Sequence, residues 1–306
     1  RPDCIKTAGD FRDCIAVDET ASAVRWCYEG LNDKLGGIFP ATLTTVLAGS
    51  GTGKTTFCKE VIYSLLMQGK RVGMVCLEES NRRTLLGLVG IHLSKNLLVD
   101  RSQATDAEVV EAFDDLFGDR TCVLLDHFGS NDIDTIEARV RYMCVAHGAE
   151  VVLIDHVSML VSGREGDDRK NLDIAMTRLR VLCAELSCSM LLVSHLSRPS
   201  GDRGHEAGAA ISLSQARGSH AIAQLSDACI GLQVDPQDPD ADTRILRVLK
   251  NRWSGETGHA GTLHYTRSDG RLREDVLALL QQEQEQKEGA EHGFEAAHDT
   301  ATEDAA

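Results

Sequence analysis

A glycine-rich segment stands between an apolar run at 43–47 and a helical pattern at 54–67. The segment reads Gly49, Ser50, Gly51, Thr52, Gly53, Lys54, Thr55 and Thr56. Glycines let consecutive backbone N–H groups converge on phosphate oxygens, and the N-terminus of the following helix adds partial positive charge. Lys54 is expected to reach the β- and γ-phosphates of a nucleotide, and the Thr55 hydroxyl to bind Mg²⁺. The segment therefore predicts a strand–loop–helix unit that binds a nucleoside triphosphate.

The rest of the body alternates strand and helix patterns. Further apolar runs lie at 72–77, 122–125, 151–154 and 190–193. Helical patterns lie between them, at 81–93, 106–117, 134–146 and 171–186. Continuous Val, Ile and Leu runs are typical of strands buried on both faces, so we predict an α/β fold with a mostly parallel central sheet flanked by helices. Two later strands, at 228–234 and 245–249, precede a predicted hairpin over 262–272.

The two ends of the chain differ from this body. Residues 1–40 are irregular apart from a short helical pattern at 21–28. Residues 41–273 form the predicted NTPase domain. Residues 274–306 have too little apolar content to pack, which predicts a disordered acidic tail.

The formal net charge of −15 at first argues against a nucleic-acid partner. Ten acidic residues and one lysine fall within 274–306, however, so most of the excess belongs to the tail and the body is only mildly acidic. No apolar run reaches the roughly 18–20 residues that span a bilayer, so a membrane protein is not expected. The ten cysteines contain no Cys-x-x-Cys pair, which favours free thiols in a reducing cytoplasm.

Two aspartates end apolar strand patterns in the same way. Asp155 follows the run at 151–154, and Asp126 follows the run at 122–125. A carboxylate at the C-terminal tip of a parallel strand faces the crevice where α/β sheets bind ligands, and here it could hold Mg²⁺. We prefer Asp155, because a long helix and another strand that ends in a polar residue follow it. Asp126 stays open as the alternative.

Two glutamates follow the strand pattern at 72–77. A carboxylate at this point could deprotonate the water that attacks the γ-phosphate. Glu78 and Glu79 could also simply favour the N-terminus of the next helix, with Ser80 as its cap. Glu78 lies nearer the strand tip and is the predicted catalytic base. His195, at the end of a third strand pattern, is predicted to sense the γ-phosphate.

Arg252 follows a late strand pattern and precedes Trp253. A guanidinium supplied to the nucleotide of a neighbouring subunit would act as an arginine finger, which raises the rate by roughly 10³- to 10⁵-fold. The alternative is a surface arginine stacked on Trp253. Spacing alone does not separate the two.

Together these motifs resemble those of the ring helicase half of T7-like bacteriophage primase–helicases, within the wider RecA/DnaB-like group. The resemblance runs from about residue 30 to 273, and it implies that residues 1–40 form an N-terminal linker and subunit-contact segment. It rests on Ser50-Gly51-Thr52-Gly53-Lys54, Leu77-Glu78-Glu79-Ser80, Ile154-Asp155-His156-Val157-Ser158, His195-Leu196, Arg217-Gly218-Ser219, Gln224-Leu225-Ser226-Asp227, Lys250-Asn251-Arg252 and Gly255-Glu256-Thr257-Gly258.

The resemblance implies a RecA-like P-loop NTPase core that forms a homo-hexamer, or a ring of seven, with ATP or dTTP and Mg²⁺ bound between subunits. It implies the same roles as above for Lys54, Thr55, Glu78, Asp155, His195 and Arg252. It also places Lys250 near the nucleotide and stacks Tyr265 on the base.

The resemblance further implies DNA in the central channel of the ring, held by loops that carry Arg198, Arg203, Arg217, Gly218 and Ser219. Several copies of each arginine around one strand would neutralise phosphates locally, despite the acidic body. The implied activity is a replicative helicase that moves 5′→3′ on single-stranded DNA and unwinds forked duplex. The acidic tail would contact the replicative DNA polymerase, in the cytoplasm of a phage-infected host.

Two other classes share the nucleotide-binding motifs. A RecA-like recombinase would hydrolyse NTP while it forms open filaments. A non-catalytic P-loop scaffold would bind nucleotide only to assemble.

Overall fold

The computed structural model describes residues 5–13, 15, 22–126, 132–161, 167–196, 204–205, 208–216, 220–238 and 242–275. The strands are β1 (Leu43–Ala48), β2 (Val72–Cys76), β3 (Cys122–Leu124), β4 (Val151–Asp155), β5 (Ser189–His195), β6 (Ala228–Val234), β7 (Thr243–Asn251), β8 (Gly258–Thr266) and β9 (Arg271–Glu274). The α-helices are α1 (Glu29–Leu35), α2 (Lys54–Met67), α3 (Asn81–Leu93), α4 (Asp106–Phe117), α5 (Ile133–His147), α6 (Asp168–Leu186) and α7 (His220–Leu225).

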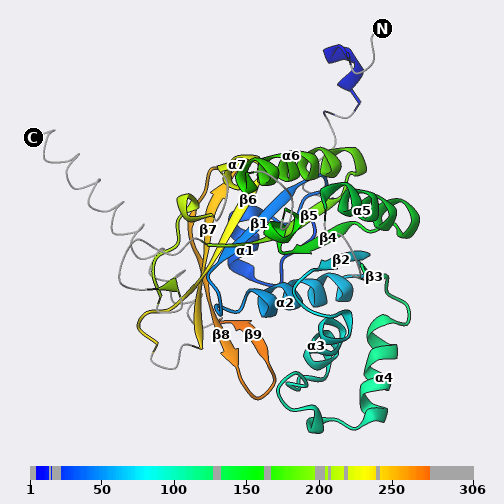
Figure 1. Cartoon of the computed structure of the whole chain (residues 1–306), viewed down its shortest axis with the longest axis vertical. Helices are drawn as coiled ribbons and strands as arrows, with labels where there is room; N and C mark the ends of the chain where they lie inside the picture. The colour runs from blue at the N-terminus through cyan, green and yellow to red at the C-terminus, as the bar shows by residue number, and fades with distance from the viewer. Residues whose placement is uncertain are drawn as a thin grey trace, which may run out of the picture.

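The strands form one sheet in the order β3-β2-β4-β5-β1-β6-β7-β8-β9 (Figure 1). In this spatial order, every neighbouring pair between β3 and β6 is parallel, and every pair between β6 and β9 is antiparallel. The predicted α/β class with a mostly parallel sheet is confirmed. The predicted C-terminal hairpin is also confirmed, as β8 and β9.

Helices cover both faces of the sheet, with α5, α6 and α7 together on one side in Figure 1. Because side chains alternate along a strand, β1 contributes to two cores. Val46 and Ala48 pack with the side chains of α1 and α2. Leu43 and Leu47 pack with those of α5 and α6. Burial on both faces explains why the strand patterns in the sequence are continuously apolar.

Local signals set several helix ends. The Ser80 hydroxyl accepts a hydrogen bond from the Arg83 N–H at the start of α3, and Thr105 forms a capping box with Glu108 at the start of α4. Gly148 ends α5 in the left-handed region, at a φ of 68°. The observed bounds of α2, α3 and α4 coincide with the ranges predicted from the sequence.

The helical pattern predicted at 21–28 is wrong. Val24 instead forms an antiparallel bridge with Ile38, and the helix of this region is α1. The Asn32 side chain holds the preceding turn, because its Oδ1 accepts from the Trp26 N–H at 2.9 Å. Tyr28 is buried in the same core as α2. The division at residue 40 stays a prediction.

The parallel pairing gathers the predicted site at one edge of the sheet. Ala48 pairs with His195, and Cys76 pairs with Asp155. The tips of β1, β5, β4 and β2 therefore lie next to one another. The predicted disordered tail lies outside the described residues beyond Asp275. In the part of the chain that the structure describes, no helix combines the length and apolar character needed to cross a bilayer.

Candidate nucleotide-binding and catalytic site

The glycine-rich loop joins β1 to α2. Gly51 and Gly53 have φ values of 73° and 93°, in the left-handed region that glycine adopts without a steric cost. The Thr52 hydroxyl and the Lys54 ammonium both donate to the Gly49 carbonyl oxygen, at 2.9 and 2.6 Å. The loop is thus closed on its own backbone, with the N-terminus of α2 at its end.

Lys54 is buried, and burial lowers the pKa of its ammonium group. The negative charges of Asp155 and Glu78 oppose this shift. Lys54 follows β1, Glu78 follows β2 and Asp155 ends β4, and the parallel pairing of these strands through β5 brings the three predicted residues to one edge of the sheet.

Asp155 ends β4 and is only 5% exposed. Burial, followed by the nearby charge of Glu78, raises the pKa of its carboxyl group to about 6. Its Oδ1 atom is buried and has no hydrogen-bond partner among the described residues. An oxygen-binding cation would satisfy this atom and favour the charged carboxylate. Asp155 thus meets the chemical requirements of the predicted Mg²⁺ ligand.

The order of the strands separates Asp155 from its competitor. Asp126 follows β3, which is the edge strand and lies four strand spacings from β1, or about 19 Å. Asp155 lies on β4, two spacings from β1, or about 10 Å. Asp126 also accepts a hydrogen bond from Asn81 at 3.4 Å. The geometry favours Asp155 as the residue near the phosphate-binding loop.

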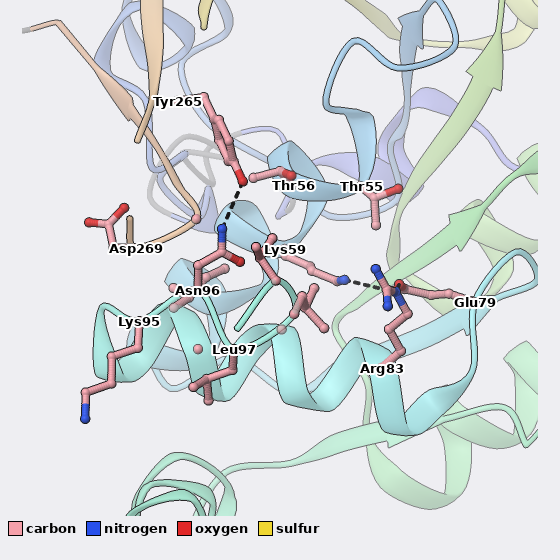
Figure 2. A pocket seen from close by; sticks show the side chains of 16 residues that line it. Thr55, Thr56, Lys59, Glu79, Arg83, Lys95, Asn96, Leu97, Tyr265 and Asp269 are labelled. Carbon is pink, nitrogen blue, oxygen red and sulfur yellow. Dashed lines mark hydrogen bonds and ion pairs between the residues drawn. The ribbon is translucent and has the colours of Figure 1, made fainter. Parts of the chain in front are cut away.

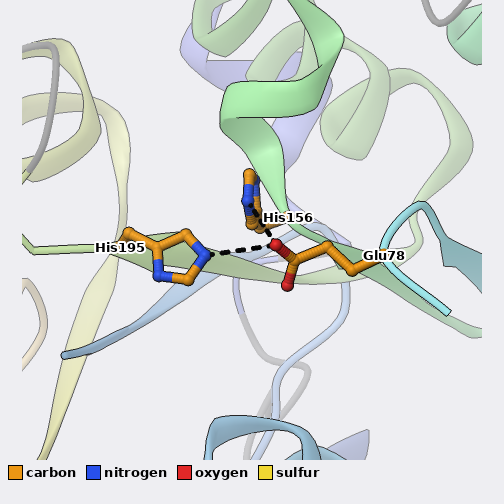
Figure 3. A group of neighbouring side chains, drawn as sticks. All are labelled: Glu78, His156 and His195. Atoms are coloured by element: carbon orange, nitrogen blue, oxygen red, sulfur yellow. Dashed lines mark hydrogen bonds and ion pairs between the residues drawn. The ribbon is translucent and has the colours of Figure 1, made fainter. Parts of the chain in front are cut away.

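The two adjacent glutamates point to different partners. Glu79 forms an ion pair with Lys59 at 2.7 Å and accepts a hydrogen bond from the Thr84 hydroxyl at 2.8 Å. Glu78 instead lies with its Oε1 atom 2.9 Å from His156 Nε2 and 3.4 Å from His195 Nε2 (Figure 3). Glu79 therefore ties α2 to α3, whereas Glu78 lies among the strand tips.

His156 is a site residue to which the motifs gave no role. Its ring meets the His195 ring edge-on, with centroids 4.3 Å apart. Burial lowers the pKa of both imidazoles, so both are neutral near pH 7 and each has one N–H to donate. Both Nε2 atoms face the same oxygen of Glu78. The only signal for His156 in the sequence is its place directly after Asp155.

Glu78, His156 and His195 also have donor atoms within 4.8 Å of one another. Nitrogen and carboxylate donors suit transition metals better than Mg²⁺. The hydrogen bonds from the two imidazoles to Glu78 account for the cluster without an ion, and we interpret it as a network that holds Glu78.

His156→Ala is expected to lower kcat for NTP hydrolysis by about 10- to 100-fold, because Glu78 loses its shorter hydrogen bond and is misplaced. Steady-state hydrolysis and nucleotide titration should show a reduced kcat with a largely unchanged nucleotide Kd. His92→Ala is the matched control, since His92 pairs with Asp115 at 2.8 Å on α3 and α4. Equal kcat values for the two variants would contradict the role of His156.

A cleft of about 320 Å³ begins at the first turn of α2 (Figure 2). Thr55, Thr56 and Tyr265 line it, and the Tyr265 hydroxyl lies 3.2 Å from Asn96 Nδ2. The structure therefore brings Tyr265 to the cleft that opens at the end of the phosphate-binding loop. This position is compatible with the expected stacking on a base.

Arg252 and Lys250 lie at the opposite edge of the sheet. β7 runs antiparallel, and Asn251 pairs with Ala228, which pairs with Thr44 near the start of β1. The length of β1, about 17 Å, separates this edge from the phosphate-binding loop of the same chain. The structure does not bring these two residues to that loop.

Local contacts hold both side chains at this edge. Arg252 forms an ion pair with the buried Asp227 at 2.8 Å and is 52% exposed. The Trp253 ring packs against Phe39. The Lys250 ammonium donates to carbonyl oxygens at the end of α7, those of Ala223, Gln224 and Ser226.

The predicted DNA-binding residues Arg198, Arg203, Arg217, Gly218 and Ser219 all lie outside the described residues. The residues that precede the two predicted loops are described. Leu196, directly after His195, forms an antiparallel bridge with Ala216, directly before Arg217. Leu196 and Ala216, which precede the segments that carry Arg198 and Arg217, therefore lie side by side at the tip of β5.

A family model of the DnaB-like helicase C-terminal domain matches residues 23–271. A DNA helicase/primase of Enterobacteria phage T3 is 36% identical over 281 residues, which are 89% of this chain and 50% of that protein. A probable plasmid replicative DNA helicase of Chlamydia trachomatis is 27% identical over 232 residues, which are 74% of this chain and 49% of that protein. The chain spans about half the length of these curated relatives.

Solved structures share the fold. The ATPase domain of G40P superposes with a TM-score of 0.69 at 17% identity, covering 86% of this chain and 95% of that one. A DnaB-like replicative helicase, described with its interactions with primase, gives a TM-score of 0.72 at 18% identity, covering 88% and 68%. At these identities the likeness shows the fold alone, and it confirms the predicted RecA-like core.

Proposed function

Because this chain belongs to the DnaB-like helicase C-terminal domain family, we propose that it is a ring-forming, NTP-dependent replicative DNA helicase. One observation carries the catalytic part of this proposal. Lys54, Asp155 and Glu78 lie at one edge of the sheet, where β1, β4 and β2 end, with Glu78 beside two histidines. This set supplies a phosphate ligand, a Mg²⁺ ligand and a base, the groups that NTP hydrolysis needs.

ATP or dTTP would bind with its phosphates in the loop from Gly49 to Thr56. Lys54 would exchange its bond to the Gly49 carbonyl for the β- and γ-phosphates. Mg²⁺, held by Thr55 and Asp155, would neutralise phosphate charge when bound. Glu78 would take a proton from water while the water oxygen bonds to the γ-phosphorus and the bond to the β–γ bridging oxygen breaks.

His195 couples this chemistry to the proposed DNA contacts. Its imidazole lies beside Glu78, and the Leu196–Ala216 bridge follows immediately in the chain. Loss of the γ-phosphate would shift the tip of β5 and the two loops that begin there. Arg198, Arg203 and Arg217, with Gly218 and Ser219, would carry this movement to single-stranded DNA and drive 5′→3′ translocation.

The distance between Arg252 and its own phosphate-binding loop supports a trans site. A finger from one subunit can complete the next only in an assembly, and the assembly that we propose is a closed ring of six or seven copies. Forked duplex DNA is the proposed substrate, and the replicative DNA polymerase the proposed partner of the tail. The likeness to a phage helicase/primase supports action in the cytoplasm of an infected host.

With Mg²⁺ and ATP or dTTP, the protein is expected to release the labelled strand of a forked duplex that has a 5′ single-stranded arm. Removing that arm should abolish strand release, since a 5′→3′ motor loads there. Lys54→Ala is the control for nucleotide dependence. DNA-stimulated hydrolysis without strand release would contradict the proposal, and open filaments in electron micrographs would then indicate a recombinase.

A further inference from the structure

Arg244 on β7 is a buried arginine that contacts the phosphate-binding loop. Its side chain is 9% exposed, and its Nε donates to the Thr52 carbonyl oxygen at 2.7 Å. Its Nη1 donates to the Thr243 carbonyl oxygen at 3.0 Å. A Cβ atom on Gly53 would lie 3.8 Å from the same Nε, so the guanidinium rests directly against the loop.

The strand pairing explains how a residue so far along the chain reaches the loop. Leu232 of β6 pairs with Ala48 of β1 on one side and with Leu246 of β7 on the other. Leu232 and Leu246 both point to the core on the α2 face of the sheet. Val234 lies two residues after Leu232 on β6, and Arg244 lies two residues before Leu246 on β7. Val234 and Arg244 are directly opposite each other, on the same face as these leucines and beyond the end of β1.

The bond to Thr52 has a consequence for the next amide. The peptide group is planar and trans, so the Thr52 C=O and the Gly53 N–H point in opposite directions. Holding the carbonyl towards Arg244 turns the Gly53 N–H away from Arg244. Gly53 is the N-cap residue of α2, and its N–H is one of the loop donors expected to bind phosphate oxygen. On the other side of the loop, Lys54 and Thr52 fix the Gly49 carbonyl in the same manner.

We propose that Arg244 is a positioning residue of the phosphate-binding loop, which orients the Gly53 amide and thereby sets the affinity for the triphosphate chain. The inference rests on the proposed nucleotide-binding function. Arg244 acts through the backbone of the loop, so its contribution is independent of which base the nucleotide carries.

The surrounding charges keep the guanidinium in place. Burial lowers the pKa of Arg244, and the carboxylates of Asp242 and Asp238, together with Tyr265, act in the opposite direction. Asp242 also forms an ion pair at 3.0 Å with Arg267, which directly follows β8. Arginine retains its charge under such a shift, because its pKa starts above 12. The charged hydrogen bond to Thr52 is therefore present throughout the neutral pH range.

Arg244→Ala is expected to raise the Kd of ATP, dTTP and inorganic tripolyphosphate alike, each by about tenfold, because one charged hydrogen bond is lost. Calorimetric titration with Mg²⁺ and without DNA would measure all three ligands. kcat at saturating nucleotide should stay within a few-fold of its original value. Arg247→Ala is the matched control, since Arg247 lies on the same strand but points to the other face.

A second variant separates positioning from loss of folding. Val234→Arg combined with Arg244→Val moves the guanidinium to the opposite residue of the same pair and should restore most of the triphosphate affinity. Arg244→Lys, which can still donate to one carbonyl, should restore part of it. Thermal unfolding of each variant would verify that the fold is intact.

Three outcomes would overturn the inference. They are unchanged tripolyphosphate affinity in Arg244→Ala, a loss confined to one base, or equal losses in Arg247→Ala. The Lys54→Ala variant distinguishes failure of the inference about Arg244 from failure of the proposed function. If Lys54→Ala weakens tripolyphosphate binding and Arg244→Ala does not, only the inference fails; if neither weakens it, the proposed nucleotide site itself is wrong.

Discussion

Glu78→Gln is expected to lower kcat for NTP hydrolysis by about 10²- to 10⁴-fold, the range that a general base contributes. Glutamine has nearly the same shape and still accepts a hydrogen bond from His156, but its amide cannot take a proton from water. Nucleotide affinity should therefore be largely unchanged. Steady-state hydrolysis of ATP and dTTP, together with titration of the same nucleotides, would measure the two quantities separately.

The adjacent carboxylate provides the control. Glu79→Gln should leave kcat largely intact and lower the free energy of unfolding by about 1–3 kcal/mol, because it weakens the partly buried pair with Lys59. The two variants differ by one position and remove the same charge. A Glu79→Gln protein without turnover, beside an active Glu78→Gln protein, would place the base on Glu79.

Arg252→Ala is expected to lower kcat by about 10³-fold or more if each arginine completes the site of the neighbouring subunit. Lys54→Ala should be equally inactive, because its own phosphate-binding loop fails. A mixture of the two should recover hydrolysis. Wherever a Lys54→Ala subunit supplies its Arg252 to an Arg252→Ala subunit, one site contains every group. Hydrolysis measured across mixing ratios should be greatest near equal proportions.

Arg252 also has a structural contact, and the control must account for it. Its ion pair with Asp227 is shared with Arg180, whose Nε lies 3.6 Å from the other carboxylate oxygen. Arg180→Ala removes a contact to the same aspartate without removing the proposed finger, and should keep most of the hydrolysis. If mixed Arg252→Ala and Lys54→Ala proteins remain as inactive as each alone, Arg252 acts within its own subunit or only in folding.

Local signals in the sequence predicted most of the elements. The phosphate-binding loop and the Ser80 cap involve residues a few positions apart, and the helices that they begin were predicted with the observed bounds. The 21–28 pattern failed because a distant partner, Ile38, competes for Val24. The pattern of residues 21–28 carries no information about a pairing with residue 38.

The sequence by itself determined the fold class and the nucleotide-binding loop, and it indicated which strand ends carry reactive side chains. Only the tertiary structure decided how those ends are arranged. The strand order favours Asp155 over Asp126, the contacts of α2 occupy Glu79 and leave Glu78 to the histidines, and the antiparallel β7 carries Arg252 away from its own loop.

The sequence motifs assigned no role to His156 or Arg244, and the reason is the same for both. The role proposed for each depends on a neighbour that is distant in sequence, Glu78 in one case and Thr52 in the other. Periodicity and capping report only on residues within a few positions of each other. Pairing between strands brings together residues nearly 200 positions apart, and this pairing is fixed by burial of the whole sheet between its helices.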